Sequence, residues 1–285
     1  METKFIDGKA IAKAVRNEVA KEVKEISLNG SEKPKLAVVL VGEDPASQTY
    51  VKSKEKACVQ VGMESESYRM PENTTEAELL NLIQKLNEDS SVNGILVQLP
   101  LPRHISVDPV IQMIDPDKDV DGFHVRNIGN MAKGGCREYL PCTPNGVMEL
   151  LKRSQIEIEG KHCVVIGRSN LVGKPVSLLL QEANGTVTMC HSRTKDLAQF
   201  CRMADILVVA AGKPHLINGF MIKEGAVVID VGIHRTESGL CGDVDTESCV
   251  GIASAITPVP GGVGPMTVAM LMQNCLQAYK KQRNI

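Results

Sequence analysis

Three polar side chains stand where an acid–base site could form. Tyr50 and Lys54 are four residues apart in "SQTYVKSKEKA" (47–57), so on a helix they lie on one face. A lysine can transfer protons near neutral pH when burial and its neighbours lower its pKa. Gln98 lies in the apolar run "GILVQLP" (94–100), where an amide needs a hydrogen-bond partner. Spacing alone favours a solvated helical face at Tyr50 and Lys54, and a satisfied core amide at Gln98.

The segment "DPDKDVDGFH" (115–124) carries four aspartates, whose carboxylates could bind a cation or an organic ligand. Aspartate beside Pro and Gly is typical of a turn-forming loop, which can also be a cation site of low specificity. Asp121 differs from the other aspartates because its neighbours, Val120 and Gly122, are apolar. We interpret Asp121 as a carboxylate that could accept paired hydrogen bonds from an amidine-like ligand edge.

The loop "TPVPGGVGPMT" (257–267) is nearly free of polar side chains, with three prolines and three glycines among residues 257–265. Glycine lets the backbone approach a ligand closely, and loops commonly carry binding residues. An ordinary loop explains the glycines, yet this density of Pro and Gly is high for a connector. The composition therefore indicates a rigid surface for a flat ligand.

A strand–turn–helix pattern gives the strongest local signal, "VVIGRSNLVGKP" (164–175), in which an apolar strand ends at Gly167 and Gly173 opens a helix. Unpaired N–H groups and the positive end of the helix dipole attract a pyrophosphate. The spacing departs from G-x-G-x-x-G, because Ser169 stands in place of the second glycine and an extra residue intervenes. Spacing alone leaves two interpretations open, a dinucleotide site and a structural turn.

The next strand end, in "TVTMCHSRT" (186–194), indicates which dinucleotide would bind. An NAD site commonly has an acid there to hold the ribose hydroxyls, whereas this segment offers Ser192 and Arg193 and has no acid before Asp196. Arg168 lies in the preceding glycine turn. A hydroxyl with guanidinium groups suits a ribose 2′-phosphate, which favours NADP over NAD. A solvated loop cation remains the alternative for Arg193.

Apolar runs separated by turn residues predict alternating strands and helices. Strands are expected at 35–42, 65–70, 94–100, 162–167, 186–190, 206–212 and 226–232, and helices at 8–28, 44–62, 74–89, 144–153, from 173, near 195–201 and at 264–281. The helix at 74–89 begins with a Thr-x-x-Glu capping box. Alternation of this kind predicts an α/β fold with parallel sheets in both halves of the chain.

Length and charge exclude several classes of protein. A chain of 285 residues predicts two domains. The net charge of −2 gives no general attraction to nucleic acid or anionic membrane, and 3% aromatic residues provide too few rings for base stacking. We find neither an apolar run of ~18 residues nor a leader-type start, so we expect an intracellular protein without a membrane segment.

Cysteine and histidine provide no pattern of their own. The nine cysteines are scattered without a C-x-x-C pair, and the six histidines lack metal-binding spacing. Buried reduced thiols in a cytosolic protein fit this distribution better than disulfides or a metal centre. We therefore expect no metal.

Eight motifs, in this order along the chain, resemble the bifunctional methylenetetrahydrofolate dehydrogenase/cyclohydrolase family in its stand-alone, bacterial-type form. They are "YVKSK", "GILVQLPLP", "PDKDVDGFH", "PCTPNGV", "GRSNLVGKP", "ADILVVAAGKP", "VVIDVGIH" and "TPVPGGVGPMTVAML". The resemblance runs from about the first helix to the last. It implies NADP-dependent oxidation of 5,10-methylenetetrahydrofolate, hydrolysis of the methenyl product to 10-formyltetrahydrofolate, and a cytoplasmic homodimer.

The resemblance also implies a role for individual residues. Lys54 assists hydration of the methenyl bridge, Gln98 holds or tunes it, and Asp121 grips the pterin edge. Tyr50 stacks on the aminobenzoyl ring of the folate. The other folate-binding residues are Ser47, Pro260, Gly261, Gly262 and Val263. The cofactor-binding residues are Gly167, Arg168, Ser169, Gly173, Ser192 and Arg193, with Ile233 near the nicotinamide amide.

The implied architecture is two α/β domains flanking a cleft. Residues 1–140 with the C-terminal helix 266–285 form a folate-binding catalytic domain, and 141–265 form a Rossmann-like, doubly wound NADP-binding domain. The alternatives are a dehydrogenase without the hydrolytic step, an NAD-preferring enzyme, and a non-catalytic nucleotide sensor. The presence of Lys54, Gln98 and Asp121 together argues against loss of hydrolysis.

Overall fold

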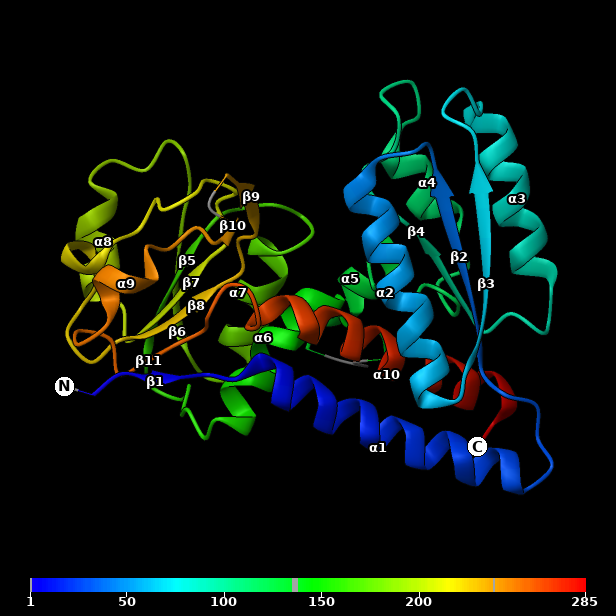
Figure 1. The fold of residues 1–285 in the computed structure, drawn as a ribbon, viewed down its shortest axis with the longest axis horizontal. Coiled ribbons are helices and arrows are strands. Elements are labelled where there is room, and N and C mark those ends of the chain that lie inside the picture. The colour runs from blue at the N-terminus through cyan, green and yellow to red at the C-terminus, as the bar shows by residue number, and fades with distance from the viewer. Residues whose placement is uncertain (1, 135–137, 238) are drawn as a thin grey trace. The chain divides into compact units, whose positions relative to one another are not determined.

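The computed structural model describes residues 2–134, 138–237 and 239–285 (Figure 1). Its chain divides into two compact units. Residues 13–142 and 268–285 form one of them, which we call the three-stranded unit after its sheet. Residues 1–12 and 143–267 form the other, the six-stranded unit.

The three-stranded unit is built on a parallel sheet in the order β3-β2-β4. The strands are β2 (Lys35–Val41), β3 (Glu64–Met70) and β4 (Gly94–Val97). The central strand β2 is apolar and buried from Leu36 onward, as expected for a strand covered on both faces. Its helices are α1 (Gly8–Leu28), α2 (Pro45–Val61), α3 (Glu76–Glu88), α4 (Val107–Met113), α5 (Val125–Ala132) and α10 (Val263–Arg283). The first residues of α1 and of α10 are assigned to the other unit.

Helix α3 shows how local sequence and packing agree. The Thr75 side chain accepts a hydrogen bond from the Glu78 backbone N–H, and the Glu78 carboxylate accepts one from the Thr75 N–H, which forms the predicted capping box. Leu79 and Ile83, four residues apart, are fully buried in a cluster with Val39 of the sheet. The amphipathic pattern of α3 therefore fixes which face of the helix covers the sheet.

The six-stranded unit has a fully parallel sheet in the order β1-β11-β8-β7-β5-β6. Its strands are β1 (Lys4–Phe5), β5 (His162–Ile166), β6 (Thr186–Cys190), β7 (Ile206–Val209), β8 (Val227–Asp230) and β11 (Ala255–Ile256). The chain runs from β5 outward to β6 and then returns to β7 on the other side of β5. Ligands of such Rossmann-like sheets bind at this switch point, beyond the carboxyl ends of the strands.

Short elements complete the six-stranded unit. They are α6 (Cys142–Arg153), whose first residue belongs to the three-stranded unit, α7 (Gly173–Glu182), α8 (Leu197–Met203), the 3₁₀ helix η1 (Gly219–Met221), α9 (Thr246–Cys249), and the antiparallel pair β9 (His234–Thr236) and β10 (Gly239–Cys241). Buried aliphatic side chains of β5, β7 and β8 form much of its core.

The predicted α/β class and Rossmann-like sheet are confirmed, whereas several boundaries are corrected. The strand predicted to reach residue 212 ends at Val209, because Ala210 and the following residues turn away to form the edge of a cavity. Residues 1–12 do not group with 13–140, because β1 pairs with β11 in the six-stranded sheet. Two-residue strands such as β1 have too few residues for any periodicity to show.

Candidate active site

Helix α2 brings Lys54 into the interior of the three-stranded unit. Asp44 caps the helix by accepting from the Ser47 N–H at 2.7 Å, and Gly62 ends it in the left-handed conformation. Ser47, Val51 and Lys54 lie on its buried face, where Lys54 is only 8% exposed. The Ser47 hydroxyl is buried and has no hydrogen-bond partner among the described residues. Tyr50, at 42% exposure, lies at the border of this face.

Gln98, the residue after β4, is the hydrogen-bond partner of Lys54. The Lys54 Nζ is 2.8 Å from the Gln98 Oε1, and the Gln98 Nε2 donates to the Leu99 carbonyl at 2.6 Å. Because the amide nitrogen is used by Leu99, the amide oxygen must face the lysine. The structure thus brings together two residues that lie 44 positions apart, and it corrects the interpretation of Lys54 as a solvated residue.

Burial shifts the proton affinities at this site. Desolvation lowers the pKa of Lys54, although the nearby charges of Asp121 and Cys142 oppose the shift. Desolvation also raises the pKa of Asp121, which the charge of Lys54 opposes. Both shifts favour the neutral forms. A buried amine of this kind can act as a proton acceptor.

Asp119 holds the loop that carries Asp121. Its buried carboxylate accepts from the backbone N–H of Gly122 at 3.1 Å, from that of His124 at 2.8 Å, and from the Asn127 side chain at 2.8 Å. Gly122 has a φ of +78°, and a Cβ there would lie 2.7 Å from backbone atoms of Leu140 and Pro141. The turn after Asp121 therefore requires glycine.

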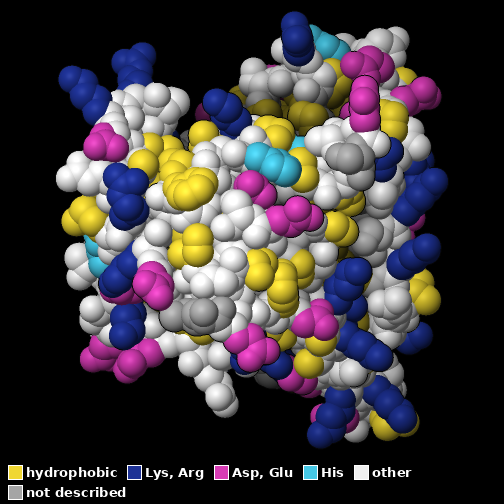
Figure 2. All heavy atoms as spheres, turned by 60° about the vertical axis from the view of Figure 1, so that its left-hand side comes forward, with side chains coloured by type: hydrophobic (Ala, Val, Ile, Leu, Met, Phe, Trp, Pro, Cys, Tyr) yellow, Lys and Arg dark blue, Asp and Glu magenta, His cyan; other side chains and the backbone are white. Residues whose placement is uncertain are grey.

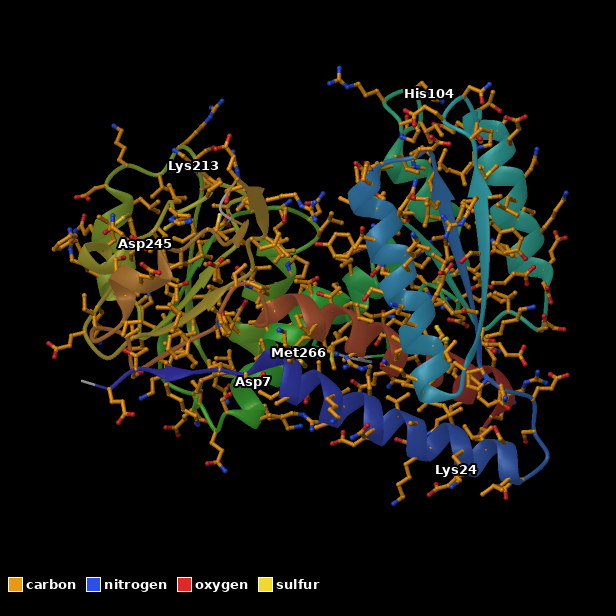
Figure 3. All side chains as sticks on the ribbon, viewed as in Figure 1. Asp7, Lys24, His104, Lys213, Asp245 and Met266 are labelled. Carbon is orange, nitrogen blue, oxygen red and sulfur yellow. The ribbon has the colours of Figure 1, made fainter. Side chains whose placement is uncertain are left out.

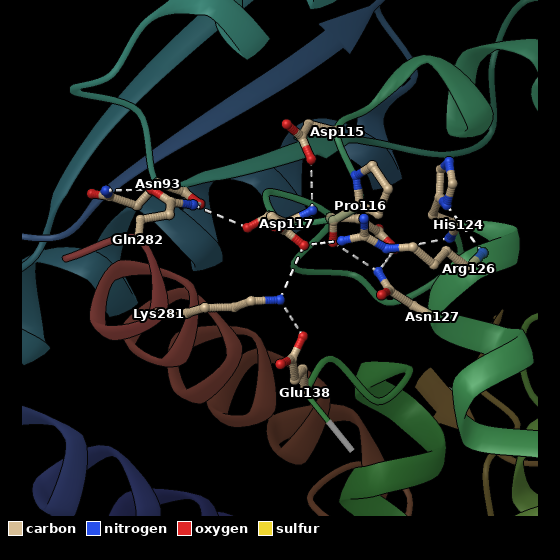
Figure 4. A network of polar contacts seen from close by, with 11 residues as sticks. Asn93, Asp115, Pro116, Asp117, His124, Arg126, Asn127, Glu138, Lys281 and Gln282 are labelled. Carbon is tan, nitrogen blue, oxygen red and sulfur yellow. Dashed lines mark hydrogen bonds and ion pairs between the residues drawn. The ribbon is translucent and has the colours of Figure 1, made fainter. Parts of the chain in front are cut away.

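The remaining charges of the loop are structural (Figure 4). Lys118 Nζ donates to three carbonyls at the end of α3, those of Leu86, Asn87 and Asp89. Asp117 forms ion pairs with Arg126 and Lys281. The described parts of the chain contain no cluster of three His, Cys, Asp or Glu side chains suited to a metal ion. Lys118 and Asp117 of the acidic loop thus form structural contacts, whereas the Asp121 carboxylate lies near Lys54.

Sequence reasoning missed Asp119 and Cys142. The Cys142 thiol donates to the Val120 carbonyl at 3.3 Å, and its pKa is raised well above the usual value by burial and by the charge of Asp121. Asn274 of α10 donates to the Val120 carbonyl at 2.8 Å and lies 3.6 Å from the Cys142 sulfur. The only sequence feature that pointed to Cys142 was the motif "PCTPNGV". Cysteine spacing did not distinguish it from the other eight cysteines. Eight cysteines are free, and Cys136 lies outside the described residues.

Several residues predicted to bind the cofactor lie at the carboxyl edge of the six-stranded sheet. A cavity of about 420 Å³ opens there, between the segments that follow β5, β6 and β7. Gly167, Arg168 and Ser192, three of the residues predicted to bind the cofactor, line this cavity. His191, Thr194 and Lys213 also line it, and Lys213 was not predicted (labelled in Figure 3). Apolar side chains make up the rest of the described lining, which contains no carboxylate, and this composition suits a phosphate group.

Two glycines allow the phosphate-type turn to form. A Cβ at Gly167, whose φ is +127°, would lie 2.2 Å from the Ala210 carbonyl oxygen, and a Cβ at Gly173 would lie 2.2 Å from that of Gly167. The Ser169 hydroxyl accepts from the N–H of Val172 at 3.1 Å and of Gly173 at 3.3 Å. Ser169 therefore orders the start of α7, which explains why serine can replace the second glycine of the usual pattern.

Other predicted residues do not line this cavity. Ser169, Gly173, Arg193 and Ile233 are absent from its walls. The Arg193 N–H donates to His191 Nδ1 at 3.2 Å, so its backbone shapes the turn. Ile233 is 45% exposed and lies between β8 and β9. A role for these side chains at the cofactor stays a prediction.

The predicted folate loop belongs to the six-stranded unit. Pro260 is exposed, whereas Gly261, Gly262 and Val263 are buried. The loop packs tightly on the first turn of α1, since a Cβ at Gly8 would lie 1.9 Å from the Gly262 carbonyl oxygen. The contact of this loop with a folate stays a prediction.

Charged side chains of both signs occur together on one face of the molecule. On the face shown in Figure 2, Lys and Arg side chains are interspersed with Asp and Glu, in keeping with the net charge of −2. No helix within the described ranges combines the length and the apolar composition needed to cross a membrane.

Comparison with known families gives two matches that together span most of the chain. Residues 6–121 match the catalytic domain of tetrahydrofolate dehydrogenase/cyclohydrolase. Residues 141–283 match the NAD(P)-binding domain of the same family.

Similar proteins match the chain over nearly its whole length. The bifunctional protein FolD of Agathobacter rectalis is 60% identical over 278 residues, which are 97% of this chain and 99% of that protein. The crystal structure of the bifunctional FolD of Campylobacter jejuni has a TM-score of 0.96 at 50% identity, over 98% of this chain and 99% of that one. The Trypanosoma brucei dehydrogenase–cyclohydrolase, solved with NADP and an inhibitor, has a TM-score of 0.96 at 40% identity over 100% of both chains.

Proposed function

This chain belongs to the tetrahydrofolate dehydrogenase/cyclohydrolase family, and from that premise we propose that Lys54, Gln98 and Asp121 perform its hydrolytic step. The chain is an NADP-dependent enzyme with both activities of the family. It oxidises 5,10-methylenetetrahydrofolate to the 5,10-methenyl compound and hydrolyses that product to 10-formyltetrahydrofolate. What remains to be assigned is the task of each side chain.

The observation that carries the proposal is the buried lysine bonded to an amide oxygen. In hydrolysis, the oxygen of water bonds to the cationic methenyl carbon and a proton leaves that water. Lys54, held toward its neutral form by burial, accepts the proton directly or through a second water. The bond from this carbon to N5 then breaks, N5 gains a proton, and one proton is released overall.

Gln98 and Asp121 orient the participants in this scheme. Gln98 accepts one N–H of Lys54 at 2.8 Å, which directs the remaining positions of the nitrogen toward the substrate. Asp121 offers a carboxylate to the paired N–H donors of the pterin edge, an arrangement that gives direction as well as energy. Tyr50, at the border of the buried face, offers its ring to the aminobenzoyl group.

The oxidation step needs alignment rather than a proton-transfer group. A hydride passes from the one-carbon bridge to the nicotinamide ring, so the protein has to bind two flat rings in contact. Arg168, Ser192 and Lys213 line the cavity and provide donors for the ribose 2′-phosphate of NADP. A dehydrogenase that lacked hydrolysis would not need the buried Lys54.

Replacement of Lys54 by Met tests the hydrolytic assignment. Lys54→Met should lower hydrolysis of the methenyl compound at least ~100-fold, the range expected for loss of a general base, while hydride transfer to NADP continues. Lys24→Met, in which an exposed lysine of α1 is changed, is the matched control (Figure 3). Hydrolysis at the wild-type rate in Lys54→Met would remove the basis for the proposal.

We also infer that the protein is a cytoplasmic homodimer, as the resemblance implies. Strand β3 is at the edge of its sheet, where its outer backbone groups can pair with a second chain. Val59, next to this edge, is 76% exposed and lines an open groove with Ser65 and Ser67. Eight cysteines are free among the residues that the structure describes, which supports a reducing compartment.

Sedimentation of the purified chain tests the dimer. The wild type should sediment at twice the mass of one chain, and Val59→Asp should shift it toward the monomer because it buries a charge at the edge. A monomeric wild type would contradict the inference, and so would a variant that dimerises with unchanged affinity.

A further inference from the structure

Asp243 is a buried carboxylate of the six-stranded unit that receives four hydrogen bonds. It lies in the loop between β10 and α9 and is fully buried. One oxygen, Oδ2, accepts from the backbone N–H of Ala211 at 2.6 Å and of Gly212 at 2.9 Å. The other, Oδ1, accepts from the N–H of Lys213 at 2.9 Å and from His234 Nε2 at 2.7 Å. All the positions around the carboxylate are occupied by donors, so His234 carries its proton on Nε2.

The donors come from two segments, one of which borders the cavity at the carboxyl edge of the sheet. Residues 211–213 follow β7, and both Ala211 and Lys213 line the cavity. His234 follows β8 and is the neighbour of Ile233, the residue we expect at the nicotinamide. A single carboxylate therefore joins the ends of two adjacent parallel strands. Figure 3 labels Lys213, which belongs to one of these segments, and Asp245, which lies two residues beyond Asp243 in the chain.

A second buried carboxylate holds Asp243 in place. Asp230, the last residue of β8, accepts from the N–H of Gly232 at 2.9 Å, of Asp243 at 3.0 Å and of Val244 at 2.9 Å. Its own N–H donates to the Thr257 hydroxyl at 2.8 Å. The loop of Asp243 is thus fixed to the sheet itself, and not only to neighbouring loops.

Two glycines make room for the carboxylates. A Cβ at Gly242 would lie 1.8 Å from Asp230 Oδ2, and a Cβ at Gly232 would lie 2.4 Å from Asp243 Oδ1. Such close approaches to side-chain oxygens, which are themselves fully hydrogen-bonded, leave no room for a larger residue. The sequence "DVGIH" is therefore shaped around this pair of carboxylates.

We propose that Asp243 is a positioning residue for hydride transfer, which acts through His234 and the 211–213 backbone to fix the nicotinamide end of the cavity. This inference rests on the proposed binding of NADP in that cavity. Neither Asp243 nor His234 touches the reacting atoms. Their effect is on the distance and angle between the nicotinamide and the folate, on which the rate depends steeply.

Asp243→Asn replaces one acceptor oxygen by a donor and leaves an N–H of the cluster without a partner. We expect kcat of the dehydrogenase to fall ~10-fold or more and KM for NADP to rise, because the nicotinamide end is less well fixed. Hydrolysis of the methenyl compound, measured without NADP, should stay at the wild-type rate. Asp245→Asn is the matched control, since Asp245 only caps α9 and its loss should leave both activities unchanged.

Two substitutions of His234 keep the inference testable if Asp243→Asn fails to fold. His234→Gln retains an N–H that can reach Asp243, whereas His234→Leu has no donor. The Gln variant should retain dehydrogenase activity within about threefold, and the Leu variant should show the defect expected for Asp243→Asn. Equal activities for the two variants would overturn the inference.

A failure of this inference can be distinguished from a failure of the proposed function. If Arg168→Gln does not weaken NADP binding, Arg168 does not bind the 2′-phosphate in this cavity, and the binding on which the inference rests fails with it. If Arg168→Gln weakens NADP binding while Asp243→Asn keeps the wild-type kcat and KM, only the positioning role is wrong.

Discussion

The two sites of this protein are built from different parts of the chain. The hydrolytic site that we propose depends on side chains, since Lys54, Gln98 and Asp121 come from a helix, a strand end and a loop. The cavity that we propose for the cofactor depends on backbone for its shape, since it lies where β5, β6 and β7 end and a Cβ at Gly167 would lie 2.2 Å from the Ala210 carbonyl oxygen. A side-chain site can lose one functional group without losing its shape. A backbone site can be lost through one added atom that carries no function.

Gly173→Ala should give the largest effect on the backbone site. The added Cβ would lie 2.2 Å from the Gly167 carbonyl oxygen and 2.8 Å from the Arg168 nitrogen, so the turn that faces the phosphates must move. We expect the dehydrogenase kcat/KM for NADP to fall ~100-fold, as for other displacements of about 1 Å at a binding site. Steady-state kinetics of the dehydrogenase reaction measure this kcat/KM, and the hydrolytic reaction is measured on the same protein.

Hydrolysis in the Gly173→Ala protein is the internal control. The methenyl compound should be hydrolysed at the wild-type rate, because the residues we assign to hydrolysis belong to the three-stranded unit. A parallel loss of both activities would mean that the two sites are not separable in this way.

Arg168→Gln should have a smaller effect, restricted to one cofactor. Arg168 lines the cavity with Ser192, and loss of one charge-assisted bond costs about 1.5 to 3 kcal/mol. The preference for NADP over NAD, taken as the ratio of kcat/KM values, should therefore fall ~10- to 100-fold while activity with NAD is retained. An unchanged ratio would show that Arg168 does not bind the 2′-phosphate.

The sequence predicted the fold well because long elements have a period that can be counted. The apolar runs of β2, β5 and β7 and the capping box at Thr75 are local features. Strand β1 could not be predicted, because its two residues pair with β11, about 250 positions away. Its place in the six-stranded unit depends on this distant pairing.

The residues around Lys54 were harder to predict than the fold, because their roles depend on contacts between distant parts of the sequence. Lys54 and Gln98 looked like a surface residue and a core amide until the family resemblance was considered, because their contact joins residues 44 positions apart. Asp119 could not be separated from Asp117 by neighbours alone, yet one is buried and the other forms surface ion pairs. Long-range contacts decide such roles, and a single sequence does not show them.

Both units bury carboxylates, and in the six-stranded unit one of them should make the stability of the fold depend on pH. Burial raises the pKa of Asp230 in the six-stranded unit to about 6, from 3.8 for an exposed group. The native state therefore holds this proton more tightly than the unfolded chain does. The stabilisation is fully present below pH ~4 and is lost as the pH rises through about 6.

Asp230→Asn removes this titration. The free energy of unfolding of the wild type, minus that of the variant, should fall by about 2 to 3 kcal/mol between pH 4 and pH 7. Urea denaturation at several pH values measures it, provided the transitions are two-state. A difference that stays constant over this range would contradict the raised pKa.

Tyr50→Phe should have the smallest effect on activity, and it tests whether the proposed hydrolytic site uses the ring of Tyr50 or its hydroxyl. Tyr50 is 42% exposed, and stacking on a folate ring would involve the face of its ring rather than its hydroxyl. Both activities should stay within about twofold of the wild type in Tyr50→Phe. Tyr50→Ala should raise KM for the folate ~10-fold, because aromatic pairs contribute about 0.5 to 1.5 kcal/mol beyond their buried area. A large loss of activity in Tyr50→Phe would instead show that the Tyr50 hydroxyl takes part in the chemistry. The Ser47 hydroxyl would then be the next group to test, because it is buried and has no hydrogen-bond partner among the described residues.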